Sequence, residues 1–487
     1  MAHSSFLLPN LTSRRATQVA AALVVSAAAA GCKVGPDYEG PPVENVGVPD
    51  EFSAIDDPTF VPGEADLRVW WTVFDDPMLS DIIDAVAENN RDLRVAVAKV
   101  GEARARINIA TAGRSPNVSL GGGSAATGNT DTGFASGLTS SLSAEASWEV
   151  DVFGRIARQI ESAEADFAAP EADRRDVQVS LFAEAADRYL SVRRLQEQLR
   201  VAEANLETQN EILDLTRIRE RDGLASRLDV VRAEQQVASN EAQLPPLRID
   251  LNRNINTIAL LVGEAPQNLP FDLETPQPLP VPPAEIVIGI PAELLRQRPD
   301  VRAAERRLAA QSARVGVAVS QLYPQFGLGG SINSDLAGSP LGFSLGPSVR
   351  WTLFDGGALE SQVDVADAQL EQAALRYEQT VLRALEEVES AMTAFIEQRL
   401  RLEAVETSAA SAQEAYDLAT RLYRDDLIDF QALLSVEMEL STANAQVAEA
   451  SGLSTQNLVA LYKALGGGWD PDQLETADTE DTTDQDD

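Results

Sequence analysis

The chain contains one large unit twice, and this duplication constrains the fold more than any other feature of its 487 residues. The stretch "NRDLRVAVAKVGEARARINIATAGRSPNVSLGGGS", from Asn90, resembles "RPDVRAAERRLAAQSARVGVAVSQLYPQFGLGGS", from Arg298. Further on, "SWEVDVFGR" matches "RWTLFDGGA", and "GLASRLDVVRAE" matches "DLIDFQALLSVE". The spacing stays near 205 residues, whereas solenoid repeats recur every 20 to 50 residues, roughly. The sequence therefore indicates a duplicated large unit and not a repeat array.

Each copy predicts the same order of elements: a helix, two strands, a long helix, a tight turn and a returning helix. Pro77 and Pro291 open the first helices, as expected from the preference of proline for the first helical turn. We expect these helices at about 77–113 and 291–321. The first copy spans 77–268, with strands at about 116–125 and 139–152 and a helical hairpin at about 154–262; the second spans 291–468, with strands at about 324–333 and 343–353 and a hairpin at about 357–465.

Both pairs of predicted strands alternate between apolar and polar residues. In "LTSSLSAEASWEVDVF" the apolar positions include Trp148, and the positions between them include Glu145 and Glu149. The second copy places Arg350 beside Trp351 in the same way. This pattern is typical of a membrane barrel strand, with lipid outside and water inside, but also of a half-buried soluble sheet. In a barrel, Glu145, Glu149 and Arg350 would face the lumen, and because barrels start at about eight strands, four strands would require an oligomer.

Two predicted helices are too long for a single globular core. From Gly154 to Arg221 nothing resembles a loop except Pro170, where we expect a kink or a local break. The counterpart from Gly357 to Arg424 contains no proline. Apolar residues recur in steps of three and four, as in coiled coils, and at about 1.5 Å per residue such a helix reaches on the order of 100 Å. A tube or a stalk accommodates helices of this length.

Two short turns, "RDGLASRLD" and "RDDLIDFQA", join the long helices to the returning helices. Gly223 provides a helix stop, and Ser226 and Asp429 suit the N-cap positions of the returning helices. Each copy therefore ends in a helical hairpin whose tip lies far from the strands.

The N-terminus predicts secretion followed by lipid attachment. Two arginines precede an apolar, alanine-rich run, as in a signal peptide, and "AAGC" ends at Cys32, the single cysteine of the chain. This ending resembles a bacterial lipobox, although Ala29 stands where leucine is commoner. We expect residues 1–31 to be removed and Cys32 to carry a lipid at the start of an extended segment, 32–76. The alternative is an ordinary signal peptide followed by an incidental cysteine.

Composition argues against enzymatic chemistry in the mature chain. The one histidine, His3, leaves with the signal peptide, which excludes histidine-based catalysis, and a lipid-bearing cysteine is no nucleophile or metal ligand. We therefore expect no metal and no cofactor besides the lipid. Signal removal lowers the Lys and Arg count from 39 to 37 against 76 Asp and Glu, so the net charge moves from −37 to −39. A field of this sign repels nucleic acid.

Two more expectations concern the rest of the chain. The acidic tail, 469–487, contains no basic residue, and we expect it to be disordered. After residue 31 no stretch is long and apolar enough for a transmembrane helix, so any membrane contact would come from strands or from lipid.

Several motifs in order resemble those of a known family. The duplicated strand–strand–hairpin unit, the lipobox followed by "KVGPDY", "SWEVDVFGR" and "LVGEAP" together resemble outer-membrane factors of tripartite efflux systems, the TolC-like family, and most closely its NodT-like lipoprotein branch. The resemblance runs from Cys32 to about Trp469. It implies a mainly α-helical homotrimer in which twelve strands close one outer-membrane β-barrel and twelve helices continue it as a periplasmic α-barrel. Segment 32–76 and the Pro-rich linker 269–290 would contribute to an equatorial region.

The resemblance also implies a tube that is closed at rest by its periplasmic hairpin tips, here 223–234 and 426–437. Some relatives carry an acidic residue where this chain has Ser435. The alternative role of the tip aspartates is helix capping, and for the tip arginines it is salt bridging between hairpins. The candidate gate residues are Asp229, Asp425, Asp426, Asp429, Gln431 and Ser435, and the candidates for adaptor or inter-hairpin contact are Arg219, Arg221, Gly223, Leu224 and Leu427.

At the expected junction of barrel and helices, two tryptophans and two glycines stand in matching positions. Trp148 and Trp351 suit anchors at the membrane interface, or else local packing. Gly154 and Gly357 would permit the bend from strand to helix.

The function implied is an exit duct for small molecules, not an enzyme, in the outer membrane of a Gram-negative bacterium. A periplasmic adaptor and a proton-driven inner-membrane efflux pump would be its partners. Two alternatives remain at this stage: an outer-membrane channel of type I protein secretion, and a periplasmic coiled-coil lipoprotein scaffold without a pore. The alternating strands favour a duct over a scaffold.

Overall fold

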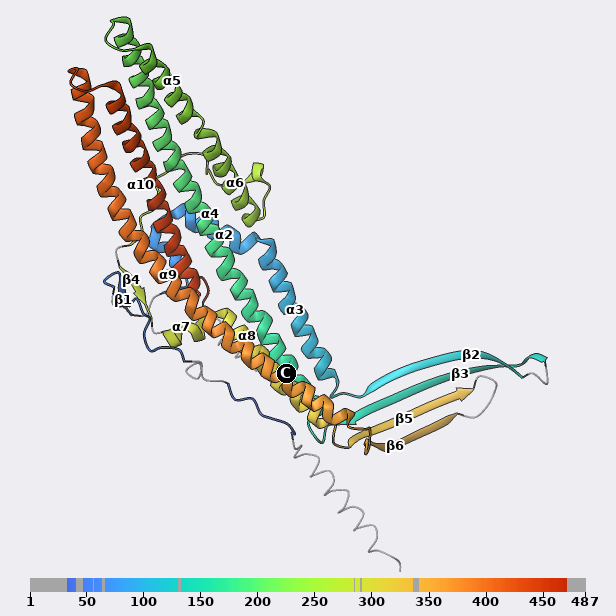
Figure 1. The fold of residues 1–487 in the computed structure, drawn as a ribbon. Helices are drawn as coiled ribbons and strands as arrows, with labels where there is room; N and C mark the ends of the chain where they lie inside the picture. The colour runs from blue at the N-terminus through green and yellow to red at the C-terminus, as the bar shows by residue number, and fades with distance from the viewer. Residues whose placement is uncertain are drawn as a thin grey trace, which may run out of the picture. The chain divides into compact units, whose positions relative to one another are not determined.

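The computed structural model describes residues 33–40, 47–55, 57–63, 66–129, 133–283, 285–289, 291–335 and 341–470. Cys32, the expected signal peptide and residues 471–487 lie outside the described residues. The described part is mainly helical (Figure 1). Its elements are β1 Phe60–Pro62, η2 Trp70–Phe74, α2 Pro77–Asn89, α3 Arg91–Ala112, β2 Asn117–Asn129, β3 Gly133–Val150, α4 Arg155–Arg221, α5 Arg227–Glu241, α6 Leu244–Val262, η3 Pro266–Asn268, β4 Ile286–Ile288, α7 Pro291–Gln297, α8 Pro299–Ser320, β5 Gln325–Asp335, β6 Gly342–Arg350, α9 Ala358–Arg424 and α10 Phe430–Ala464.

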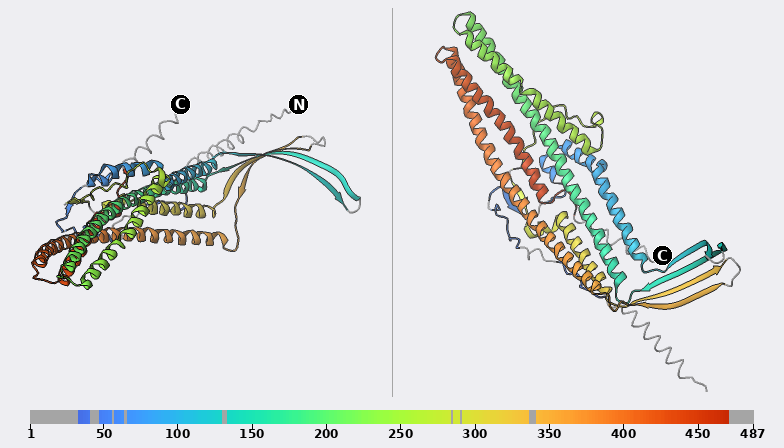
Figure 2. Two further views of the ribbon diagram at one scale, coloured as in Figure 1. Left: turned by 90° about the horizontal axis from the view of Figure 1, so that it is seen from above. Right: turned by 45° about the vertical axis from the view of Figure 1, so that its right-hand side comes forward.

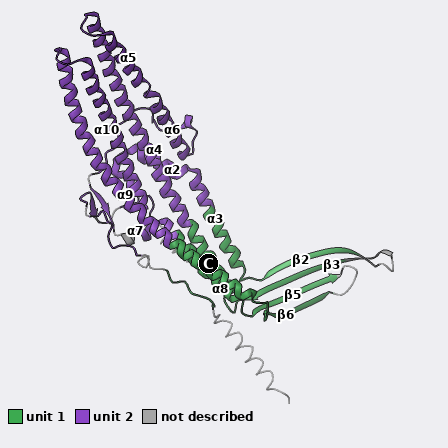
Figure 3. Cartoon of the chain, in the orientation of Figure 1, with its two compact units in different colours: residues 1–41, 99–170, 303–377 green, residues 42–98, 171–302, 378–487 purple. Residues whose placement is uncertain are grey.

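The duplication is visible in the order of elements. The series α3, β2, β3, α4, α5 recurs as α8, β5, β6, α9, α10, and the two long helices, α4 and α9, have 67 residues each. The chain divides into two compact units, coloured separately in Figure 3. Unit 1 takes segments 1–41, 99–170 and 303–377, and unit 2 takes 42–98, 171–302 and 378–487.

The first helix of each copy is interrupted, where the sequence predicted one continuous helix. In the first copy the break is at Asn90, whose side-chain oxygen accepts the N–H groups of Asp92 and Leu93, at 2.9 and 3.0 Å, and so caps α3. Its amide group also donates to the carbonyl of Leu261 at 2.8 Å. In the second copy the break is at Arg298, directly before a proline, where helical backbone is disfavoured.

Proline acts differently in the hairpin helices than the sequence predicted. The expected break at Pro170 is wrong, since α4 is continuous through this residue. Ala169 and Ala172 beside it are buried, and their packing offsets a defect that costs about 3 kcal/mol in an isolated helix. The returning helix of the first copy, by contrast, is divided into α5 and α6 just before a pair of prolines, whereas α10 runs unbroken.

Unit 1 contains an antiparallel sheet of four strands in the order β2–β3–β5–β6, which lie side by side in Figure 1. The first strand pair continues beyond the alternating sequence, with β3 beginning at Gly133. The backbone ladder extends to the pair of Asn129 and Gly133, so cross-strand hydrogen bonding sets the ends of these strands.

Unit 2 holds the main hydrophobic core, built from residues of η2, α2, α4, α6, α9 and α10. Trp70 is 1% exposed and stacks on Tyr462 with ring centroids 5.4 Å apart. In the same unit, β1 pairs in parallel with β4, so the segment before the first copy is hydrogen-bonded to the linker between the copies. No helix among the described residues has the length and hydropathy needed to cross a membrane.

A second core joins the two hairpins near their tips, also within unit 2. Figure 2 shows α4 beside α5 and α9 beside α10. Val230 of α5 and Leu433 of α10 are almost fully buried there, and Tyr423 of α9 is 3% exposed. The apolar steps of three and four that predicted helical packing supply these side chains.

Candidate functional site

The four-stranded sheet separates apolar from polar residues on its two faces. The register aligns residues of one character across all four strands, because side chains of paired residues point to the same face. One row is Leu120, Ala144, Ile332 and Phe343, and the adjacent row on the opposite face is Ser119, Glu145, Ser331 and Ser344.

The apolar face is exposed to its surroundings in the single chain. Phe343 is 86% exposed, Leu345 78% and Leu120 75%. Contiguous exposed apolar surface marks contact with a membrane or with another protein. The other large apolar residues on this face with substantial exposure are Val118, Leu142, Trp148, Leu328, Ile332 and Val349.

The three residues predicted to face a lumen all lie on the polar face. Glu145 is exposed, and Arg350 ends β6 opposite Gln325. Glu149 is half-buried because it pairs with Arg155, which donates through Nε and Nη2 at 2.7 and 2.6 Å. The structure therefore places these charges on the face opposite Leu345 and Phe343.

The strand-to-helix junctions of the two copies match in detail. Trp148 donates its indole N–H to the carbonyl of Arg114 at 2.9 Å, and Trp351 donates to that of Leu322 at 3.1 Å. These bonds tie each tryptophan to the end of the helix before the strand pair. Both indole rings remain partly exposed, which is compatible with local packing and with contact to a membrane interface.

The backbone at both junctions takes a left-handed conformation that favours glycine. Gly154 has φ +76° and Gly357 has φ +90°. Sequence analysis missed the aspartates beside them: Asp151 accepts the N–H groups of Ile156 and Ala157, and Asp355 accepts those of Gly357, Ala358 and Leu359. Their signal was an aspartate shortly before each long helix, which is a capping pattern.

At the hairpin tips, Arg219 connects the two copies. It forms an ion pair with Asp426, donates to the carbonyl of Tyr423 at 3.0 Å, and lies 4.4 Å from the ring centroid of that tyrosine. Asp426 has φ +57° at the turn position where the first copy has Gly223, with φ +74°. Arg219 thus holds an aspartate in a conformation more often taken by glycine.

The remaining predicted tip residues have three kinds of role: some cap helices, one forms a contact between the two hairpins, and the others are exposed. Asp229 forms a capping box with Ser226, and Asp429 caps α10 by accepting the N–H of Ala432 at 2.8 Å. Gln431 accepts a hydrogen bond from Arg232 at 2.7 Å, a second contact between the hairpins. The exposed tip residues are Arg221, Leu224, Asp425, Leu427 and Ser435.

A buried carboxyl group beneath the tips was not predicted. Glu437 of α10 is 2% exposed and lies near Gln209 of α4, which is fully buried. Burial raises the pKa of Glu437, and Gln209 offsets the shift in part. Glu437 sits on the same helical face as the core residues, so only its charged character could have marked it in the sequence.

Replacing Glu437 by Gln is expected to stabilise the hairpins at high pH. Because the pKa of Glu437 is raised in the folded chain, its contribution favours folding at low pH and is lost as pH rises through the folded pKa. The variant should therefore have a higher Tm than the parent at pH 8 and an equal Tm near pH 4. The exposed Glu439→Gln on the same helix is the control, and equal Tm values at pH 8 would contradict the expectation.

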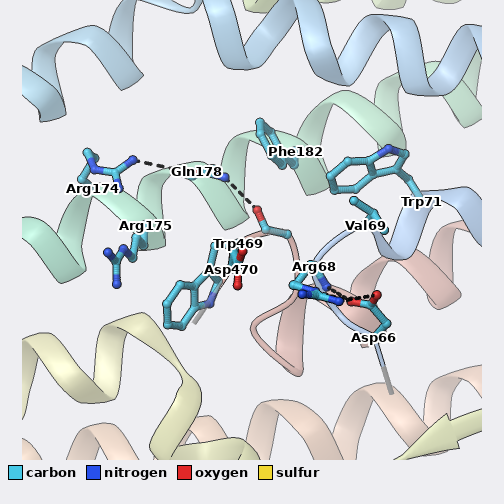
Figure 4. Close-up of a pocket in the computed structure, with 11 residues that line it drawn as sticks. Asp66, Arg68, Val69, Trp71, Arg174, Arg175, Gln178, Phe182, Trp469 and Asp470 are labelled. Atoms are coloured by element: carbon cyan, nitrogen blue, oxygen red, sulfur yellow. Dashed lines mark hydrogen bonds and ion pairs between the residues drawn. The ribbon is translucent and has the colours of Figure 1, made fainter. Parts of the chain in front are cut away.

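Unit 2 also contains a cavity of about 460 Å³ beside its C-terminal end (Figure 4). Trp469 lies on one side, with the guanidinium of Arg175 4.9 Å from its ring centroid. Gln178 donates to the carbonyl of Gly468 at 2.8 Å and so fixes this end of the chain to α4. Burial lowers the pKa of Arg175, and Glu171 opposes the shift. Within the described ranges, no cluster of His, Cys, Asp and Glu side chains suits a metal ion.

Comparisons with known proteins agree with this architecture. The family model described as outer membrane efflux protein matches residues 82–264 and 290–467. Nodulation protein T of Rhizobium leguminosarum bv. trifolii is 31% identical over 91% of this chain and 95% of its own length, and the pyoverdine export outer membrane protein OpmQ of Pseudomonas putida is 33% identical over 83% and 88%. The structure of the outer-membrane channel OprN superimposes with a TM-score of 0.82 at 35% identity, covering 90% of this chain and 100% of that one. The chain therefore belongs to the outer membrane efflux protein family.

Proposed function

We propose that three copies of this outer-membrane efflux channel protein form the exit duct of a tripartite pump for small molecules. Members of the family are outer-membrane channel components of efflux pumps and not enzymes, so a pump partner is implied. The trimer, the adaptor and the substrate class are our proposals, because family membership alone does not establish them. In the proposed assembly, twelve strands close a β-barrel and twelve helices continue it as an α-barrel in the periplasm.

The observation that carries the proposal is the sheet of unit 1, with one exposed apolar face and one polar face. An apolar face suits lipid, and a face with Glu145 and Arg350 suits water. Four strands leave two open edges, and barrels start at about eight strands, so closure requires further copies. A coiled-coil scaffold without a pore would have no use for this apolar surface.

Small molecules are the proposed cargo because relatives of this chain serve such cargo. OpmQ, for example, is named for the export of pyoverdine. The paired β1 and β4 support an equatorial region made from segments 32–76 and 269–290. Cys32 is proposed to carry a lipid, which would make the protein a lipoprotein held in the outer membrane by both sheet and lipid.

Leu224 and Leu427 are proposed to contact a periplasmic adaptor. They are 62% and 68% exposed at the two turns, and exposed apolar residues at the tip of an otherwise polar hairpin suit a protein partner. A channel for type I protein secretion would contact a different adaptor through these turns. The exposed residues of the turns do not favour an unfolded polypeptide as cargo, so the small-molecule duct is preferred.

Arg219 is proposed to hold the duct closed, and Arg219→Ala is expected to open it. The variant loses an ion pair and a hydrogen bond that join the two hairpins; hydrogen bonds to charged groups contribute about 1.5–3 kcal/mol, so the open population should rise by about tenfold or more. The measurement is single-channel conductance of the purified protein in planar bilayers, after native mass spectrometry has established its oligomeric state.

Arg217→Ala provides the matched control, because Arg217 pairs with Glu234 inside the first hairpin and not with the second hairpin. Its conductance should equal that of the parent protein. A strictly monomeric detergent-extracted protein, or one without any conductance in all three forms, would overturn the duct. A trimer that conducts equally with and without Arg219 would overturn only the gate.

A further inference from the structure

Residues 33–38, named here the N-terminal strap, lie against α4 and α8 of unit 1 as an ordered segment. At its start, Lys33 forms an ion pair with Glu161 at 2.6 Å, and the N–H of Val34 donates to the carbonyl of Phe153 at 3.3 Å. At its end, the hydroxyl of Tyr38 donates to Glu305 at 2.6 Å. Both ends of the strap are therefore bonded to the body of the unit.

Arg158 of α4 binds the middle of the strap. Its side chain is 0% exposed, and its guanidinium donates to the carbonyls of Val34 and Gly35, each at 3.1 Å, and to Asp37 at 2.8 Å. A further pair of contacts to Glu161, both at 3.0 Å, balances the charge. A buried guanidinium needs several such partners, since burial without them is costly. The strap supplies three of them.

Glycines make room for this contact. A Cβ on Gly316 of α8 would lie 2.7 Å from Nε of Arg158, and a Cβ on Gly35 would lie 2.5 Å from Cα of Gly316. Gly35 also has φ +87°, a conformation that favours glycine. Arg158 thus passes between two positions where any larger residue would collide with it or with the strap.

The start of the strap lies at the junction of β3 and α4. A Cβ on Gly154 would lie 3.0 Å from Cα of Lys33, and the bond from Val34 to Phe153 is at the same place. The apolar face of the sheet ends at this junction, where β3 finishes with Val150. The start of the strap and the end of β3 are therefore adjacent in unit 1.

We infer that Arg158 is a positioning residue that locks the strap in place and so fixes the start of the mature chain at the β3–α4 junction. Lys33 is held at this junction, so a lipid attached one residue earlier has no flexible spacer of described residues between it and the strap. This consequence for the lipid rests on the proposed lipidation of Cys32; the lock itself does not. In this proposal the lock limits how far the lipid can move from the apolar face of the sheet.

Trypsin cleavage after Lys33 tests the lock in the full-length, detergent-solubilised protein. Proteolysis requires local opening of the strap, and Arg158→Met removes hydrogen bonds from a charged group. The rate at which the product beginning at Val34 appears should rise by about tenfold or more over the parent. Cleavage after Arg221 in the exposed first turn is the internal reference and should not change. The experiment is run on the parent and on Cys32→Ser, so that shielding by lipid is separated from shielding by the strap.

Three further variants distinguish the lock from a general loss of stability. Gly316→Ala, which displaces the Arg158 side chain from the other helix, should expose Lys33 as Arg158→Met does. Asp37→Asn removes the charge of an 84% exposed carboxylate but keeps an oxygen that can accept from Arg158, so it should have a small effect. Arg314→Met on α8 breaks an exposed pair with Asp166 of α4 and should have no effect. Unchanged protection of Lys33 in both Arg158→Met and Gly316→Ala would overturn the inference. Intact mass and oligomeric state, measured on the same samples, report separately on lipidation and on the duct.

Discussion

Leu345→Arg is expected to abolish most assembly of the protein in the outer membrane. Leu345 is 78% exposed on the apolar face of the sheet, and an arginine facing lipid costs about 2–4 kcal/mol near the middle of the bilayer. A trimer would bear this cost three times. The measurement is the amount of trimer in the outer-membrane fraction, compared with the amount of total protein.

Ser344→Arg is the matched control, because Ser344 precedes Leu345 on the same strand but belongs to the polar face. Its hydroxyl lies 3.0 Å from that of Ser331 in an exposed pair. This variant should assemble at a level close to that of the parent and should alter conductance instead. Equal assembly of Leu345→Arg and Ser344→Arg would contradict the assignment of the apolar face to lipid.

Arg298→Met is expected to destabilise unit 2 by about 3 kcal/mol, as is usual when one partner of a buried ion pair is removed. Arg298 is 7% exposed at the break between α7 and α8. It donates to Asp300 at 3.0 and 2.8 Å, to Glu387 at 2.7 Å and to the carbonyl of Ala464 at 2.6 Å. The Tm of the detergent-solubilised variant, compared with that of the parent, measures the loss.

The loss should also grow with pH, because Arg298 stabilises the ionised form of Asp176. Burial, with a smaller contribution from Asp300, raises the pKa of Asp176 to about 6, and Arg298 opposes the shift. A raised pKa means that folding is penalised as pH rises through that value, so removing Arg298 adds a penalty at pH 8 that is small at pH 5. The exposed pair of Arg106 and Glu102 supplies the control: Arg106→Met should leave the Tm close to that of the parent at either pH, because exposed ion pairs contribute little to stability. A pH-independent loss would rule out the role of Asp176.

The family and the channel function were predicted from the sequence and are confirmed by the comparisons. Both follow from features that local patterns carry: a duplicated unit, two-residue alternation in strands, and apolar steps of three and four in helices. The trimer, the gate and the lipid stay predictions, because each depends on surfaces of more than one chain or on residues outside those described.

The tip aspartates show where local patterns were insufficient. Asp229, Asp426 and Asp429 looked alike as acidic residues near a turn. In the structure the first and last cap helices, whereas Asp426 pairs with Arg219, which is 207 residues away in the chain. Capping is a property of the residue and the backbone next to it, so Asp429 could be assigned in advance. The pairing of Asp426 depends on how two hairpins pack.

The sequence by itself determined the secondary-structure types, their duplicated order and the separation of apolar from polar residues in the strands, because these depend on neighbours within a few positions. Of the kink or break expected at Pro170, the break is wrong, since this residue lies inside a helix that tertiary packing keeps continuous. Only the tertiary structure decided which distant groups meet. Arg158 resembles any surface arginine in the sequence, yet it is fully buried under carbonyls 123 and 124 residues away. A buried charge selects its partners by three-dimensional distance, and that distance is set by the packing of α4, α8 and the strap together.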